Sequence, residues 1–183
     1  EVTPFCVITF LADQRKLALR HDKLRPALAV LDPALLPTAP RMVRVAAGID
    51  ALTHAVESYV SKLATAATRR RASEAIEIIG RSLEPACSEQ PDRRALSDMQ
   101  WAATLAGVAF SQTRLGIVHA MALPLSALFD VPHGLANAVL LPYGMLYNAA
   151  YAPDQFREIA RLLGADDSGP ENAAIAVRDL CRR

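Results

Sequence analysis

The chain has 183 residues, of which 52% are hydrophobic and 21% charged, and its formal net charge is +1 at pH 7. Only 8 residues are glycine, about 4% against a usual value of about 7%, and no GxGxxG or GxxxxGK[ST] loop occurs. Both observations argue against a complete nucleotide-binding domain of the familiar kinds within this chain. The near-zero charge argues against nucleic acid as a partner, because phosphate binding needs a basic excess.

The first 40 residues have the pattern of β-structure. Residues 2–10 and 16–19 are predicted to be strands joined by a polar turn at 12–15, and residues 27–31 are typical of a buried strand. The stretch 32–40 holds three of the twelve prolines. Because proline removes a backbone donor and fixes φ, this stretch predicts a connection, and we place a boundary near Pro40.

The rest of the chain has helical periodicity. Residues 65–88 show it most clearly, since Ala72, Ile76, Ile79 and Leu83 recur at helical spacing. The predicted helices are 50–61, 65–88, 92–112, 115–128, 134–151, 153–163 and 170–181. The expected fold class is therefore mainly α, with a short β segment in residues 1–39 and a helical domain in residues 40–183.

The three cysteines, Cys6, Cys87 and Cys181, stand far apart without a CxxC pair. We expect no disulfide framework, no thiolate metal site and a cytoplasmic location. The longest apolar stretch, residues 115–131, is interrupted by polar residues and is shorter than the roughly 20 residues that span a bilayer, so no membrane partner is expected. No charged-then-apolar leader opens the chain, and because it begins with Glu1 we expect that its gene starts further upstream.

Three of the four histidines have neighbours that suggest chemistry. Asp50 and His54 are four residues apart on a predicted helix and project from one face. His119 and His133 lie in apolar surroundings, where an unpaired polar group costs about 1–3 kcal/mol. On one straight helix they would stand about 21 Å apart, but the segment 129–132 lets the second helix fold back. One carboxylate and three imidazoles suit a metal such as iron or zinc.

Residue spacing alone leaves this metal site undecided. An Asp/His pair four residues apart is usually a surface pair, and a core histidine is usually hydrogen-bonded to a backbone carbonyl. Glu57, about one turn beyond His54, is open to two interpretations. It either orients a ligand imidazole or lies on the helix surface.

Two long motifs carry a family resemblance. Residues 48–57 (GIDALTHAVE) resemble the GxDALTHAxE signature of the iron-containing (group III) alcohol dehydrogenases, in the dehydroquinate synthase-like superfamily. Residues 116–122 (GIVHAMA) and 131–138 (VPHGLANA), followed by Leu141-Pro142, resemble that family's second signature. The opening Glu1-Val2-Thr3 resembles the strand that follows its threonine-rich cofactor loop. The resemblance covers essentially the whole chain and corresponds to the central and C-terminal portion of the family.

The resemblance implies a set of site residues. Thr3 and Lys16 would contact NAD or NADP, Thr3 near the phosphates and Lys16 near the adenosine end, although by itself Lys16 is typical of a solvated strand end. Phe110 matches a position near the nicotinamide and the substrate, although by itself it is typical of a core residue. The residues implied as ligands of Fe2+ or Zn2+ are Asp50, His54, His119 and His133.

Two departures from the family pattern alter what is expected. Where many members have a proton-relaying histidine four residues after the third ligand, in a MAH motif, this chain has Leu123. Leucine cannot transfer a proton, so we expect a different substrate or slower turnover. The N-terminal α/β domain with its GGGS turn is also missing, so residues 1–39 would be the residual end of that cofactor domain. We also expect these 183 residues to end before the last helices of the family's C-terminal domain.

The predicted function is that of a metal-dependent, NAD(P)-linked alcohol dehydrogenase or aldehyde reductase. It would transfer hydride between nicotinamide and a small primary alcohol or carbonyl compound, the helical domain supplying the metal site. We expect a homodimer. One alternative is a truncated, non-catalytic metal-binding fragment. Another is an enzyme like maleylacetate reductase, which works without a metal, although the presence of all four ligand types counts against it.

Overall fold

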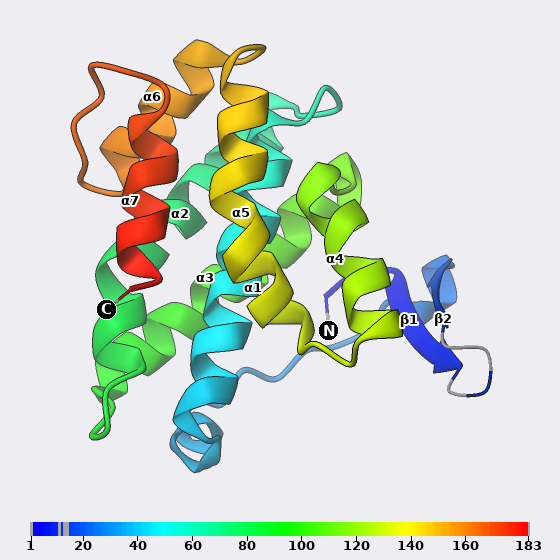
Figure 1. The fold of residues 1–183 in the computed structure, drawn as a ribbon. Coiled ribbons are helices and arrows are strands. Elements are labelled where there is room, and N and C mark those ends of the chain that lie inside the picture. The colour runs from blue at the N-terminus through cyan, green and yellow to red at the C-terminus, as the bar shows by residue number, and fades with distance from the viewer. Residues whose placement is uncertain (1, 11, 13–14, 183) are drawn as a thin grey trace.

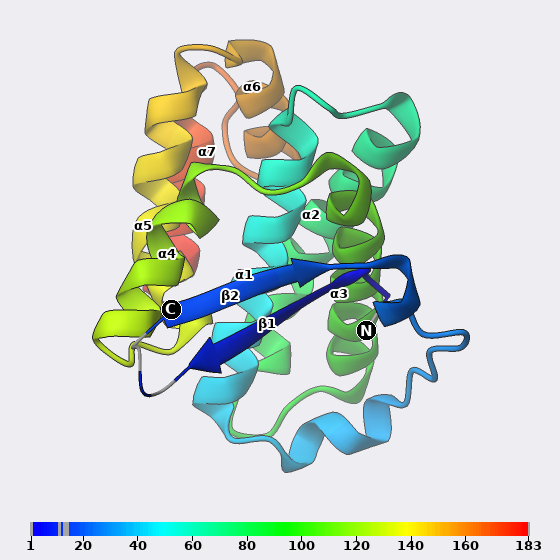
Figure 2. The ribbon, with the colours of Figure 1, turned by 90° about the vertical axis from the view of Figure 1, so that its right-hand side faces the viewer.

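The computed structural model describes residues 2–10, 12 and 15–182. Two antiparallel strands come first, β1 (Phe5–Phe10) and β2 (Arg15–Arg20), with Phe5 opposite Arg20 in the register. They form a hairpin on one side of a helical bundle (Figures 1 and 2). Two short 3-10 helices, η1 (Asp22–Leu24) and η2 (Pro33–Thr38), lie between the hairpin and the bundle in sequence.

The predicted strand at residues 27–31 is wrong. In the part of the chain that the structure describes, the sheet consists of β1 and β2, and residues 27–31 pair with neither. Leu28 and Val30 are 80% and 78% exposed. An apolar run becomes a buried strand only when neighbouring strands satisfy its backbone groups, and no strand among the described residues lies beside this one.

Seven helices follow within the described residues, which confirms the mainly α fold class. Their bounds are α1 (Arg41–Val60), α2 (Ala66–Ala86), α3 (Arg93–Thr113), α4 (Ile117–Leu128), α5 (His133–Ala149), α6 (Pro153–Leu162) and α7 (Asn172–Leu180). Their predicted boundaries are close except for α1, which begins at Arg41 rather than at Asp50. No described helix is both long enough and apolar enough to cross a membrane.

Two arginines explain why α1 begins so early. The side chain of Arg41 donates from Nε to the carbonyl oxygen of Cys87 at 2.8 Å. Arg44 donates from Nε to Ala86 and from Nη2 to Ser88, both at 3.0 Å. These carbonyls belong to the end of α2, where the helix leaves acceptors unsatisfied and favours positive charge. The first turn of α1 is therefore fixed to the last turn of α2.

The core lies where α1, α2 and α3 contact one another. Leu52, Ile76 and Ile79 are completely buried there, and the many alanines around them let the helix backbones approach closely. On its other side α1 contacts α5, and α4 contacts both α5 and β2 (Figure 1). Consequently one end of α4, the start of α5 and the hairpin surround the middle of α1.

Candidate metal centre

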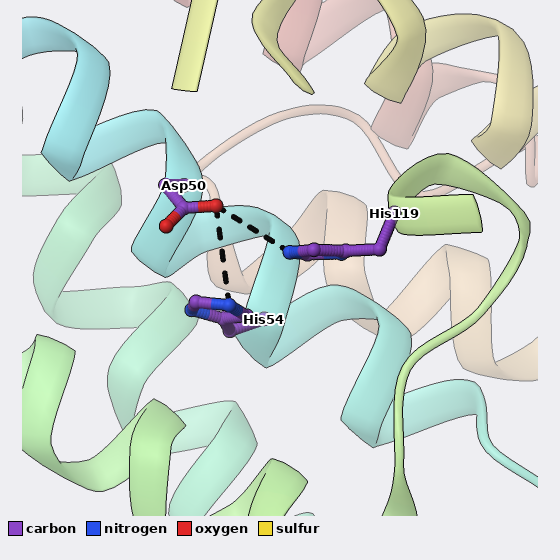
Figure 3. A group of neighbouring side chains, drawn as sticks. All are labelled: Asp50, His54 and His119. Carbon is purple, nitrogen blue, oxygen red and sulfur yellow. Dashed lines mark ion pairs between the residues drawn. The ribbon is translucent and has the colours of Figure 1, made fainter. Parts of the chain in front are cut away.

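The structure brings the four residues with predicted metal-binding roles together. Asp50 and His54 lie one turn apart on α1, His119 lies in the first turn of α4, and His133 is the first residue of α5. The Oδ1 atom of Asp50 is 3.4 Å from Nε2 of His119, 3.6 Å from Nε2 of His133 and 3.9 Å from Nε2 of His54. Figure 3 shows the side chains of Asp50, His54 and His119 pointing toward one another.

Three members of this cluster are especially close. Asp50, His54 and His119 each offer one ligand atom, and these atoms all lie within 4.8 Å of one another. The rings of His54 and His119 are stacked with their centroids 4.7 Å apart, and the ring of His133 is 5.3 Å from that of His119. His133 lies outside the closest group but beside it. We refer to Asp50, His54, His119 and His133 as the donor cluster.

The connection between α4 and α5 lets His133 return to His119. Asp130 has a φ of 53°, a left-handed conformation that turns the chain, and Pro132 comes immediately before α5. Gly134 then packs against α1, where any Cβ would overlap the carbonyl oxygen of Ala46. The missing side chain of Gly134 therefore allows the start of α5 to approach α1.

Glu57 holds the imidazole of His119 in place. Its side chain is buried, and Oε2 lies 2.7 Å from Nδ1 of His119, which donates to it. The same carboxylate accepts from the backbone N–H of Gly116 at 2.8 Å and of Val118 at 2.7 Å. Of the two interpretations of Glu57, the surface role is therefore wrong. Its contacts leave Nε2 of His119 facing Asp50.

Asn137 contacts the donor cluster from α5 and was not identified from the sequence. It is completely buried, and its Nδ2 donates to Oδ1 of Asp50 at 2.6 Å. The same nitrogen is 3.3 Å from Nε2 of His133 and 3.4 Å from Nε2 of His119. The spacing could have revealed it, since Asn137 follows His133 by four residues and shares its helix face.

The four groups of the donor cluster shift one another's pKa. Burial would raise the pKa of Asp50, but His119 and the other two imidazoles outweigh burial and lower it to about 2. Burial lowers the pKa of His54 to about 4, against the opposing effect of Asp50. Burial also lowers the pKa of His133, helped by the charges of His119 and Lys16. At neutral pH the cluster thus contains one carboxylate and two uncharged imidazoles.

His119 differs from the other two imidazoles. Burial lowers its pKa, but the hydrogen bonds to Asp50 and Glu57 prevail and raise it to about 9. The imidazole of His119 therefore carries a proton at neutral pH whenever nothing else neutralises the carboxylates on its two sides. A cation at Nε2 would replace that proton.

Two cavities adjoin the donor cluster. The larger has a volume of about 600 Å3 and is lined by the four donor residues together with Thr3, Phe110 and Leu123. The ring of Phe110 stacks on that of His54 with centroids 4.4 Å apart. A second cavity of about 410 Å3 shares Thr3, Asp50, His54 and Phe110 with the first. Lys16 does not belong to the lining of either cavity.

A helical fold with this cluster beside two cavities defines a protein with a candidate metal centre, and comparison identifies its family. Residues 44–183 match the Fe-containing alcohol dehydrogenase family, C-terminal part. The chain is 42% identical over 169 residues to 1,3-propanediol dehydrogenase of Klebsiella pneumoniae, covering 92% of this chain and 44% of that protein. The chain therefore belongs to the iron-containing alcohol dehydrogenase family.

Solved structures agree with this assignment. A crystal structure of 1,3-propanediol oxidoreductase superimposes with a TM-score of 0.92 at 40% identity, covering 97% of this chain and 48% of that one. Alcohol dehydrogenase from Oenococcus oeni gives a TM-score of 0.94 at 34% identity, covering 98% and 49%. The chain thus spans about half the length of these relatives.

Proposed function

We propose that this chain carries the metal centre of a metal-dependent, NAD(P)-linked alcohol dehydrogenase or aldehyde reductase. The convergence of Asp50 and three imidazoles from α1, α4 and α5 carries the proposal. Two ligands that are each about 2.1 Å from one ion stand about 3.4 Å apart in tetrahedral geometry. The distances of 3.4 to 3.9 Å from Asp50 Oδ1 to the three Nε2 atoms fit a shared ion after small movements.

The chemistry of the donors also fits a divalent transition metal. Nitrogen and carboxylate donors suit iron or zinc, and two of the three imidazoles are already uncharged at neutral pH. When bound, such an ion supplies Lewis-acid polarisation of an alcohol or carbonyl oxygen. Membership of the family supports Fe2+ with NAD or NADP, with Zn2+ as the second candidate ion.

The residues around the cluster suit a reaction between two molecules. The two cavities share Asp50, His54 and Phe110, so the donor cluster faces room for both a nicotinamide and a substrate. Thr3 lines both cavities, which supports its predicted role beside the cofactor. Lys16 lines neither, so its predicted contact rests on the family resemblance alone. Leu123 lines the larger cavity and cannot transfer a proton. Proton transfer in the proposed reaction therefore uses a group other than residue 123.

The names of the relatives indicate the substrate class. One relative is named 1,3-propanediol dehydrogenase, and another, from Escherichia coli (strain K12), is named lactaldehyde reductase. These names support a small alcohol or aldehyde as the substrate of this chain. The homodimer and the cytoplasmic location stay predictions.

Metal analysis tests the donor cluster. We expect about one equivalent of iron or zinc in the chain purified without chelator. The double substitution His119→Ala with His133→Ala should remove it. His21→Ala is the matched control, because His21 is exposed and its Nδ1 accepts from the backbone of Lys23. Less than a tenth of an equivalent in the unsubstituted chain would contradict the metal centre and favour the metal-independent alternative.

A titration with NADH and NADPH separates an enzyme from a non-catalytic metal-binding fragment. Because residues 1–183 span about half the length of the relatives and contain no glycine-rich dinucleotide loop, we expect weak binding to these residues alone. Tight, saturable binding would show that these residues hold a complete cofactor site.

A further inference from the structure

Two arginines line the larger cavity together with the donor cluster. Arg20 is the last residue of β2, and Arg114 directly follows the last residue of α3. Both side chains are exposed. They come from different elements, and no part of the proposed reaction uses either of them.

Arg20 is connected to His54 through aromatic rings, and Arg114 is connected to the same rings through the backbone. The guanidinium of Arg20 lies 5.4 Å over the ring of Phe5, whose centroid is 6.0 Å from that of Phe110. Phe110 in turn stacks on His54. Arg114 is one helical turn beyond Phe110, to whose carbonyl oxygen its backbone N–H donates at 2.9 Å. Arg20 therefore lies over one ring of the Phe5–Phe110 pair, the backbone of Arg114 is bonded to the residue that carries the other ring, and both arginines line the cavity that the donor cluster shares.

The charges of these arginines lack a counterion within the described part of the chain. No described carboxylate forms an ion pair with Arg20 or Arg114. The acidic residue in the described lining of the cavity is Asp50, which is already surrounded by three imidazoles. Much of the remaining lining is apolar, including Val7 and Leu115. Beside apolar walls a guanidinium attracts an anion more strongly than in open water.

The backbone of Arg114 adds a second observation. Its φ of 62° and ψ of −173° belong to a region that side-chain-bearing residues rarely adopt and that suits glycine. At the end of a helix glycine would relieve this strain. The chain instead has an arginine there, and this residue lines the cavity. Strain of this kind is typical of positions at which function outweighs stability.

We propose that Arg20 and Arg114 form an anion subsite, which binds the carboxylate, sulfonate or phosphate of a molecule that also reaches the donor cluster. Planar guanidinium groups bind such anions through paired hydrogen bonds. The inference rests on the proposed function and deepens it, because it favours a short-chain hydroxy acid or its aldehyde over an uncharged alcohol. The phosphate of a nicotinamide dinucleotide is a second source of the same chemistry.

Calorimetric titration of the zinc-loaded chain tests the subsite with two four-carbon probes. We expect 4-hydroxybutyrate to bind at least tenfold more tightly than 1,4-butanediol, which has an uncharged hydroxymethyl group in place of the carboxylate. In Arg20→Gln with Arg114→Gln this preference should fall below twofold. Arg70→Gln, a substitution on the exposed surface of α2, should leave the preference unchanged.

Parallel titration with NADH distinguishes the two sources of the anion. A tenfold loss of NADH affinity in the double variant, without any preference for the hydroxy acid in the unsubstituted chain, assigns the subsite to the dinucleotide phosphate. No effect on either ligand overturns the subsite. Zinc content measured in the same samples separates the two proposals. A chain that holds zinc but shows neither effect contradicts the subsite alone, and a chain that binds no zinc contradicts the metal centre.

Arg114→Gly keeps the test decisive if the glutamine variants are poorly folded. Glycine relieves the backbone strain, so thermal unfolding should shift upward by about 2–4 °C, while the preference for the carboxylate falls. A gain in stability with the preference intact would show that Arg114 does not bind the anion.

Discussion

The helices α1 to α3 and the N-terminal hairpin differ in how far their apolar side chains are exposed to solvent. In the helices, Leu52 and Ile76 are completely buried, whereas in the hairpin Val7 is 52% and Ile8 43% exposed. A helical bundle covers its own apolar faces, but a two-stranded sheet covers at most one of its two faces. The donor cluster lies in the helical region, which has its own apolar core, whereas the hairpin forms one wall of the larger cavity. Helix packing therefore fixes the positions of the donors, while the hairpin shapes the space in front of them.

The substitution Gly134→Ala should have the largest effect on the stability of the helical region. The new Cβ would overlap the carbonyl oxygen of Ala46 and push α5 away from α1. We expect a loss of about 3 kcal/mol of stability, together with loss of the metal. Chemical denaturation and metal analysis would measure the two effects. Gly164→Ala is the control. Gly164 has a φ of 73° with no atom near a new Cβ, so this change should cost about 1 kcal/mol through backbone strain and retain the metal.

Glu57→Gln tests a single hydrogen bond of the helical region, the one between Glu57 and His119. The amide keeps the shape of the carboxylate but loses the charge that orients His119, so metal affinity should fall about 10- to 100-fold. Competition with a chromophoric chelator would measure the affinity. Glu77→Gln changes an exposed glutamate that pairs with Arg81 at 3.7 Å and should have no effect. Equal affinity in Glu57→Gln and the unsubstituted chain would contradict the positioning role of Glu57.

Without metal, the donor cluster should make the stability of the helical region depend on pH in both directions. The pKa of His119 is raised to about 9, so its contribution is complete below about pH 6.5 and is lost as the pH rises through 9. The pKa of His54 is lowered to about 4, so its contribution is present above about pH 6.5 and is lost as the pH falls through 4.

Thermal unfolding of the chelator-treated chain should therefore be most resistant near pH 6.5. His119→Gln should remove the alkaline decline, and His21→Ala should preserve it. A flat profile between pH 6.5 and 9 in the unsubstituted chain would contradict the assigned charge of His119.

A matched pair of valines gives the smallest expected effect and isolates the difference between the two regions. Val7→Thr, on the exposed hairpin, should change stability by less than about 0.5 kcal/mol. Val56→Thr introduces the same hydroxyl at a position that is 1% exposed, where a buried unpaired polar group costs about 1–3 kcal/mol. Denaturant titration of both variants compares them directly. Similar losses would show that the hairpin is covered by apolar contacts in solution.

The helices could be predicted from the sequence because each buries one face of its own. The spacing of Ala72, Ile76 and Ile79 was sufficient to identify α2, since the period of 3.6 residues is a local property. The same approach gave a wrong prediction for residues 27–31, because whether an apolar run becomes a strand depends on neighbours elsewhere in the chain. The early start of α1 was missed for a similar reason, since Arg41 and Arg44 act on carbonyls that follow them by more than 40 residues.

The candidate site could be predicted only in part. The spacing of Asp50 and His54 was enough to place them on one helix face. Their contact with His119 and His133 depends on the turn at residues 129–132, whose geometry could not be predicted from the sequence. The family resemblance supplied that step. Glu57 could not be assigned, because its role depends on the backbone of Gly116 and Val118, about 60 residues away.

The exposed, irregular segment at residues 25–31 separates two parts of the cavity along the chain. All four donor residues follow it, whereas Thr3, Phe5 and Arg20 precede it. Proteolytic cleavage within this segment would leave one continuous polypeptide carrying every donor to the ion. By the same logic, a change confined to the hairpin would alter the part of the cavity lined by Thr3, Phe5 and Arg20 and would leave every donor residue unchanged in sequence.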